Sequence, residues 1–227
     1  MKILISLIIL ILTFNAYSQD KREFTDSFNT DSCTFSSRGW NTYFILQPGY
    51  QLVLEGVEEG DTARLVISVL NETKMIDRVE TRVVEEKESE SGKTTEISRN
   101  FYAYCEETGS IFYFGEEVDI YKEGKIVSHG GTWIAKGNNK PGVIMPGLCL
   151  LGARYYQEIA PGIAMDRAEI ISLSETYKTP AGNFTNCLKT EETSALNPKE
   201  KEFKRYAPGT GLIQDENLLL VKYGYVR

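Results

Sequence analysis

Phe101-Tyr102-Ala103-Tyr104 and Ile111-Phe112-Tyr113-Phe114 flank the turn-forming pair Thr108-Gly109. Aromatic and β-branched residues are enriched in strands, and glycine supplies the positive φ that many tight turns require. The two runs are therefore predicted to be neighbouring antiparallel strands joined by a short turn.

Similar signals recur along the rest of the chain. Ser91-Gly92, Glu123-Gly124 and Pro180-Ala181-Gly182 each place a glycine between runs of β-forming residues, and Glu123-Gly124 predicts a hairpin. Residues 184–191 alternate between two faces, with Phe184 and Leu188 on the same one, as expected for a strand. No long helical period follows residue 18. We therefore predict an all-β, mainly antiparallel fold.

The chain also contains two halves that resemble each other at an offset of about 103 residues. Residues 49–55 line up with 152–158, and residues 67–73 line up with 170–176. Phe101 and Tyr104 before Thr108-Gly109 line up with Phe203 and Tyr206 before Thr210-Gly211. Chance matches between strands rich in Val, Thr and Tyr are the alternative. The repeat predicts two related halves that form a curved sheet, a half-barrel or a sandwich.

The first residues have the pattern of a secretory signal peptide. Lys2 precedes an apolar run over residues 3–14, and Ala16-Tyr17-Ser18 places small residues where a signal peptidase cuts. The run is shorter than the roughly 20 residues of a membrane span. We predict export to the periplasm or the extracellular space, without a transmembrane anchor.

The domain organisation follows from these segments. Residues 1–18 are the predicted signal peptide and residues 19–40 a loose, polar N-terminal segment. Residues 41–136 form the first half, and residues 151–227 form the second. Residues 137–150 are a joint rich in glycine and proline. The two halves are expected to make one compact domain.

Charge and cysteine content limit the partners and the chemistry. The formal net charge of −7 makes nucleic acid an unfavourable partner, because the acidic chain repels phosphate. Four cysteines in an exported chain permit two disulfides with three possible pairings, among Cys33, Cys105, Cys149 and Cys187. Some of them could instead be small apolar residues of strands.

The sequence contains no recognisable catalytic set. Its single histidine, His129, cannot build a histidine-rich metal site and is expected near the end of a hairpin. We predict no metal, no cofactor and no catalytic residue. Paired carboxylates could hydrolyse a glycosidic bond across a cleft, and the candidates are Glu116, Glu117, Asp119, Glu158, Asp166, Glu191 and Glu192. The acidic run over residues 85–90 is interpreted as a solvated hairpin tip.

Aromatic side chains are the remaining indication of a binding site. The candidates for ligand contact are Tyr102, Tyr104, Tyr113, Tyr156 and Tyr206. Aromatic residues on a sheet can form a binding platform, but packing in the core or between strands is the commoner role.

Several motifs taken together carry a resemblance to a known family. They are Tyr156-Gln157-Glu158-Ile159-Ala160-Pro161-Gly162, Thr179-Pro180-Ala181-Gly182-Asn183-Phe184, Leu188-Lys189-Thr190-Glu191-Glu192 and Tyr206-Ala207-Pro208-Gly209-Thr210-Gly211-Leu212-Ile213. In this combination the chain resembles a widespread family of secreted bacterial β-rich proteins with no established activity. It is also similar, at the level of fold, to periplasmic half-barrel proteins, some of which carry lipids or lipoproteins.

The sequence thus favours an exported, non-enzymatic protein of the bacterial envelope. Its expected role is that of a binding or structural β module, whose partner is a lipid or other apolar ligand, or another envelope component. The alternative is a carboxylate-dependent hydrolase that acts on an envelope or extracellular polymer.

Overall fold

The computed structural model describes residues 23–58 and 60–226, so the predicted signal peptide over residues 1–18 lies outside the described residues. Regular structure in the described part is almost entirely antiparallel β-sheet, with one short 3-10 helix, η1 (Thr30–Ser32). The all-β prediction is confirmed. None of the helical residues described forms a segment long and apolar enough to cross a bilayer.

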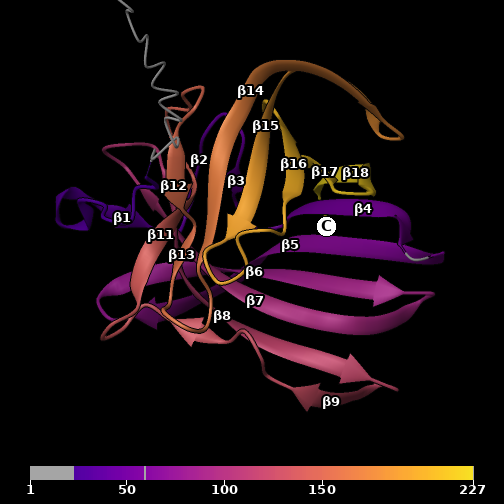
Figure 1. The fold of residues 1–227 in the computed structure, drawn as a ribbon, viewed down its shortest axis with the longest axis horizontal. Coiled ribbons are helices and arrows are strands. Elements are labelled where there is room, and N and C mark those ends of the chain that lie inside the picture. Colours follow the sequence, from indigo (N-terminus) through magenta and orange to yellow (C-terminus); the bar gives the residue numbers. More distant parts are fainter. Residues whose placement is uncertain (1–22, 59, 227) are drawn as a thin grey trace, which may run out of the picture.

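Two meanders form most of a single sheet (Figure 1). The strands of the first half are β4 (Tyr50–Glu58), β5 (Asp61–Ile76), β6 (Val79–Glu90), β7 (Lys93–Cys105) and β8 (Ile111–Lys122). Those of the second half are β14 (Asp166–Thr179), β15 (Gly182–Ser194), β16 (Glu202–Ala207), β17 (Gly211–Asp215) and β18 (Leu218–Tyr225). The meanders join where β18, the last strand, pairs antiparallel with β4.

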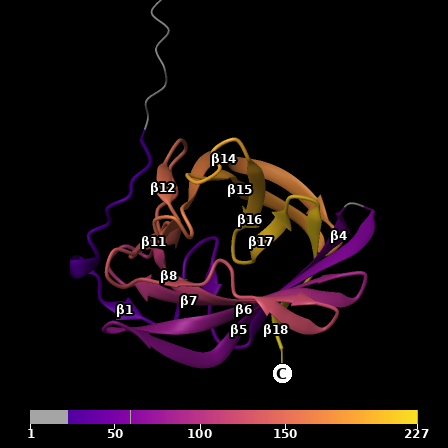
Figure 2. The ribbon, with the colours of Figure 1, turned by 60° about the horizontal axis from the view of Figure 1, so that its bottom comes forward.

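The sheet curves until its two ends nearly meet (Figure 2). At one end β12 (Arg154–Tyr156) pairs with β14, and at the other β11 (Lys140–Met145) pairs with β8 and then with β13 (Glu158–Ile159). Gln157 is the only residue between β12 and β13. The chain itself therefore connects the two ends of the sheet. The short strands β9 (Lys125–Ser128) and β10 (Trp133–Ile134) also pair with β8.

Similar hydrogen bonds occur at the start of the two halves, from glycines that the repeat aligns to carbonyl groups that lie two residues out of its register. The amide of Gly49 donates to the carbonyl of Val69, and the amide of Gly152 donates to the carbonyl of Ile170, both at 2.8 Å. Both glycines have positive φ, 86° and 80°. Each half therefore begins with a glycine turn that is hydrogen-bonded to a long strand, β5 in the first half and β14 in the second.

The predicted hairpin at Glu123-Gly124 joins β8 to β9, with Lys122 opposite Lys125. Glu123 and Gly124 have φ values of 53° and 74°, and Ser91 and Gly92 between β6 and β7 have 47° and 76°. Positive φ at both central residues is the mark of the type I′ turn, whose twist matches that of the strands.

Two predicted segments are more regular than expected. The segment from residue 23 to residue 40 is fastened to the sheet rather than loose, because Cys33 is disulfide-bonded to Cys105 and β1 (Phe35–Ser36) pairs with β7. The joint over residues 137–150 contains β11, which has hydrogen-bonded neighbours on both sides despite Pro141. Cys149 and Cys187 are free thiols.

A separate hairpin of β2 (Gly39–Trp40) and β3 (Ile45–Leu46) packs against the inside of the curved sheet. The Asn41 side chain donates to the carbonyl of Gly109 at 3.1 Å, and the amide of Gly209 donates to the carbonyl of Thr42 at 2.8 Å. The hairpin thus contacts a turn of each half. It also brings the Phe44 ring to 5.5 Å from the ring of Tyr102.

Candidate functional site

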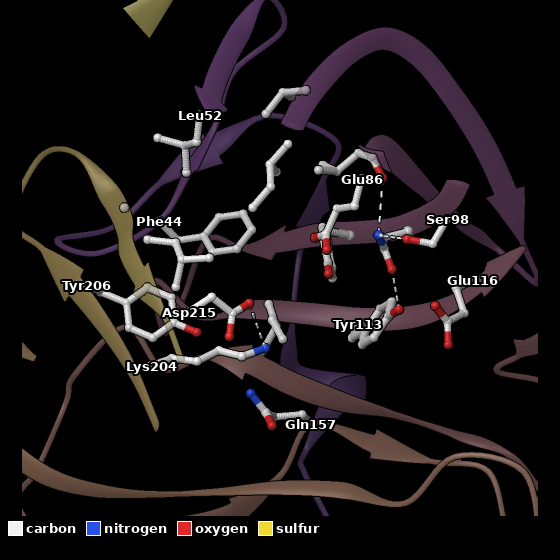
Figure 3. A pocket seen from close by; sticks show the side chains of 18 of the residues that line it. Phe44, Leu52, Glu86, Ser98, Tyr113, Glu116, Gln157, Lys204, Tyr206 and Asp215 are labelled. Carbon is white, nitrogen blue, oxygen red and sulfur yellow. Dashed lines mark hydrogen bonds and ion pairs between the residues drawn. The ribbon is translucent and has the colours of Figure 1, made fainter. Parts of the chain in front are cut away.

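The curved sheet encloses a cavity of about 270 Å³ (Figure 3). Strands of both halves line it, together with the β2–β3 hairpin. Because side chains alternate along a strand, every second residue of a lining strand points into this space. The cavity is thus a product of the whole fold and belongs to neither half alone.

One wall of the cavity is apolar. It is formed by Leu52 on β4, Ile67 and Val69 on β5, and Phe44 and Ile45 from the hairpin. The inward face of β5 carries Ala63, Leu65, Ile67 and Val69 in strict alternation. Figure 3 shows Leu52 and Phe44 on the same side of the cavity, away from Ser98 and Glu116.

The opposite wall is acidic. The register places Glu86 of β6 opposite Ser98 of β7, and Asn100 of β7 opposite Glu116 of β8. Eight carboxylate side chains line the cavity: Glu86, Glu88, Glu96, Glu116, Glu158, Asp166, Glu192 and Asp215. Lys204 is the only basic residue among the described lining residues.

Lys204 is engaged by two of these carboxylates. Its Nζ lies 3.4 Å from Glu192 Oε2 and 3.6 Å from Asp215 Oδ2. Burial by itself lowers the pKa of Lys204, but the charges of Asp215 and Glu192 raise it well above its usual value. Lys204 therefore stays protonated, and its positive charge is balanced by the carboxylates beside it.

Glu116 and Glu158 form an interacting pair near the Tyr113 hydroxyl. Burial raises the pKa of Glu116 to about 7, and a hydrogen bond with Tyr113 opposes the shift. The pKa of Glu158 is raised well above its usual value by burial and then by the charge of Glu116. Trp133 Nε1 donates to Glu158 Oε1 at 3.4 Å. Two such carboxyl groups retain a proton near neutral pH.

Glu86 belongs to the acidic wall and lies on the side of Ser98 (Figure 3). Burial raises the pKa of its carboxyl group to about 8, while Lys204 lowers it. The side chain is only partly buried by area because part of its surface faces the cavity.

This carboxyl group makes stability depend on pH. Between the usual pKa of 4.5 and about 8, the folded protein holds a proton that the unfolded chain has released, so stability falls as the pH rises. We expect Glu86→Gln to match the wild type at pH 5 and to be more stable at pH 9 by about 1 kcal/mol, after allowance for screening in the cavity. Urea unfolding at both pH values measures this difference.

The control for this prediction is Glu90→Gln, at an exposed position on the same strand. It should leave the pH dependence of stability unchanged. Equal pH dependence of Glu86→Gln and the wild type would contradict the assignment of a protonated Glu86.

The structure brings three of the five candidate tyrosines to the cavity: Tyr102, Tyr113 and Tyr206. Tyr104 is covered by the β2–β3 hairpin, where a Cβ on Gly39 would lie 2.2 Å from Tyr104 Cγ. Tyr156 lies outside the cavity lining, with its ring 6.1 Å from that of Phe24. Contact between any of these tyrosines and a ligand stays a prediction.

Some of the candidate carboxylates also line the cavity, whereas the others lie outside it. Those that line the cavity are Glu116, Glu158, Asp166 and Glu192. The others contact basic side chains outside it: Glu117 pairs with Lys74, Asp119 lies 2.8 Å from His129, and Glu191 pairs with Lys201 at 2.7 Å.

The interpretation of residues 85–90 as a solvated tip is wrong for Glu86, which is partly buried at the cavity, whereas Glu88 lines the cavity but is exposed as expected. Strand β6 continues to Glu90, and alternation from the buried Val84 points both side chains inward. The sequence displays this alternation, which could have indicated that the two side chains point inward. Lys204 and Asp215 were missed because no local pattern marks them.

Metal-ligand geometry gives no support to a preformed ion site in the cavity. Within the part of the chain that the structure describes, the only three ligand groups within 4.8 Å of one another are Cys33, Cys105 and Glu107. The two cysteines form a disulfide, so neither can supply a thiolate.

Comparisons with protein-family models, with curated proteins and with solved structures give no match. The family resemblance described above therefore stays a prediction. Function is inferred from the cavity, in which an apolar wall faces a wall of carboxyl groups.

Proposed function

We propose that this protein binds a small amphipathic molecule in the cavity of its curved sheet, without chemical conversion, after export to the periplasm or the extracellular space. The observation that carries the proposal is the cavity between an apolar and a polar wall. Ligand sites combine apolar lining with a few convergent polar groups in this way.

The size of the cavity restricts the ligand. A volume of about 270 Å³ is at the lower end of small-molecule pockets, which span roughly 300–1,000 Å³. A single short chain or one ring system matches this space, whereas a diacyl lipid exceeds it. If the ligand is a lipid, we therefore expect it to have a single chain.

Two surface clefts adjoin the cavity and are the expected route of the ligand. One is lined by Glu88, Glu90 and Asp215, and the other by Asp166 and Glu192. Both clefts share Lys204 with the cavity. The ligand therefore reaches its site from the acidic side.

A neutral fluorescent probe tests the proposal. We expect N-phenyl-1-naphthylamine to gain fluorescence on binding to the purified protein, and Ile67→Trp to weaken its binding more than tenfold because the indole fills the cavity beside Leu52. Titration with fluorescence detection measures both affinities.

The matched control is Met75→Trp, on the same strand β5 at a position that is 60% exposed. This variant should bind the probe as the wild type does. Absence of probe binding to the wild type, or equal loss in the two variants, would contradict a ligand site in the cavity.

A second candidate function is hydrolysis of an envelope or extracellular polymer by the Glu116–Glu158 pair. The observation in its favour is that two interacting carboxyl groups, one of them 7% exposed, share one cavity. The small cavity disfavours it, because a polymer needs an open cleft. Release of soluble fragments from peptidoglycan by the wild type, but not by Glu158→Gln, would establish this activity in place of simple binding.

A further inference from the structure

We propose that the polar end of the ligand is an ammonium group, held against Gln157, Glu116 and Glu158 while an apolar chain lies along Leu52 and Ile67. This inference rests on the proposed function and assigns the chemical class of its ligand. A monoalkylammonium ion is the simplest member of that class.

Gln157 supplies an observation independent of the carboxylates. Its side chain is 3% exposed and points into the cavity (Figure 3), yet its amide has no hydrogen-bond partner among the described residues. The position is fixed, because Gln157 links β12 to β13 and its backbone amide donates to Asp166 O at 2.8 Å. The amide faces the cavity and has no protein partner there, so it is placed to meet a polar group of a ligand.

The distribution of charge selects a cation as that polar group. Lys204, the only base among the described lining residues, is shared by Glu192 and Asp215 and balances one of their two charges. Glu86, Glu116 and Glu158 have no cation within ion-pair distance among these residues. An anionic ligand would be repelled, whereas an ammonium ion would neutralise the site.

The aromatic groups of the cavity fit the same ligand. The rings of Tyr102 and Tyr113 lie 4.7 Å apart beside the acidic wall. The faces of aromatic rings attract cations, and this attraction is stronger where water is excluded. The clefts that lead to the cavity also carry Glu90 and Glu202, which raise the local concentration of a cationic ligand.

The carboxyl groups predict that binding releases protons. The pKa of Glu86 is raised to about 8 and that of Glu116 to about 7, chiefly by burial. An ammonium ion favours the ionised forms, so protons leave as it binds and affinity rises with pH. The charged groups that face Glu86 are Glu88, Glu116, Lys204 and Asp215, and those that face Glu116 and Glu158 include Glu96 and Asp166.

Calorimetric titration with three probes of the same chain length tests the inference: octylammonium chloride, 1-octanol and sodium octanoate. We expect octylammonium to bind at least tenfold more tightly than octanol at pH 8, and octanoate more weakly than either. Octylammonium affinity should rise about tenfold from pH 6 to pH 8. Titrations in phosphate and Tris should give different heats, because released protons are taken up by the buffer.

Glu158→Gln and Glu116→Gln should each lower octylammonium affinity about tenfold and leave octanol affinity unchanged. The octanol titration also shows that each variant keeps its cavity. Glu117→Gln is the matched control, since Glu117 is exposed next to Glu116 and pairs with Lys74. It should bind both probes as the wild type does.

The outcomes separate the inference from the function on which it rests. Octanol or octanoate binding as tightly as octylammonium would overturn the ammonium inference and leave a binding function standing. A lack of binding by all three probes would overturn both. Tight octylammonium binding that is equally strong in Glu116→Gln and Glu158→Gln would overturn the assignment to this cavity.

Discussion

Replacing Cys33 and Cys105 together by alanine is expected to lower the free energy of unfolding by about 4 kcal/mol. The disulfide joins residues 72 positions apart, so it restricts a long loop of the unfolded chain. It also fastens the N-terminal segment to β7, where the Phe35 ring lies 5.4 Å from Phe112 and 5.2 Å from Phe114. Without the disulfide the N-terminal segment is free in the unfolded chain, and ordering it against these aromatic rings costs more conformational entropy.

Urea unfolding followed by circular dichroism measures this loss. A reducing agent added to the wild type should produce a similar shift, and Cys149→Ala, at a half-buried free thiol, should change stability much less. A double variant as stable as the oxidised wild type would show that the disulfide does not stabilise the fold.

Local patterns were sufficient to predict the strands and their turns. Alternation along β15 and the glycines of Ser91-Gly92 and Glu123-Gly124 act over a few residues, so the sequence displays them directly. A curved sheet was one of the three arrangements that the repeat predicted, beside a half-barrel and a sandwich. The pairing of β18 with β4 and the connection through Gln157 were not predicted, because they join segments far apart in the chain.

The candidate site was only partly predictable for the same reason. Tyr102 and Tyr104 are two residues apart on one strand, and their local patterns are equivalent. The β2–β3 hairpin, which comes from a distant part of the chain, covers Tyr104 with Gly39 and leaves Tyr102 at the cavity. No spacing within β7 could have distinguished them.

The acidic run over residues 85–90 was interpreted wrongly in part, because its charge hid the burial of one of its residues. Acidic residues in a run are usually solvated, which made residues 85–90 look like an exposed tip. Strand alternation was the better guide, because Val84 is 1% exposed and Glu86 points to the same side. Burial of carboxyl groups at this density is unfavourable for stability, and such a conflict is expected where a protein is built for function.

Lys204→Met is the second change with a large expected effect, a loss of about 3 kcal/mol in the free energy of unfolding at pH 8. Methionine preserves most of the aliphatic packing but removes the cation that Glu192 and Asp215 share. These two side chains are only 10% and 20% exposed, so their charges would remain without a partner in the protein interior. Chemical unfolding at pH 8 measures the loss.

The pH dependence of this loss identifies its cause. Burial already raises the pKa of Asp215, and Lys204 opposes that shift. In the variant the pKa of Asp215 rises further, so the carboxyl group is protonated more readily as the pH falls. The deficit in stability should therefore be smaller at pH 5 than at pH 8, whereas a loss of packing would be the same at both.

Lys201→Met is the matched control, because Lys201 forms a comparable ion pair at 2.7 Å with Glu191 but is 53% exposed. Its removal should cost less than about 1 kcal/mol at either pH. If Lys204→Met were no more destabilising than Lys201→Met, the charges of Glu192 and Asp215 would not depend on Lys204 for their stabilisation. Octylammonium should stabilise Lys204→Met at least as strongly as the wild type, since the variant has one more uncompensated carboxylate to attract a bound cation.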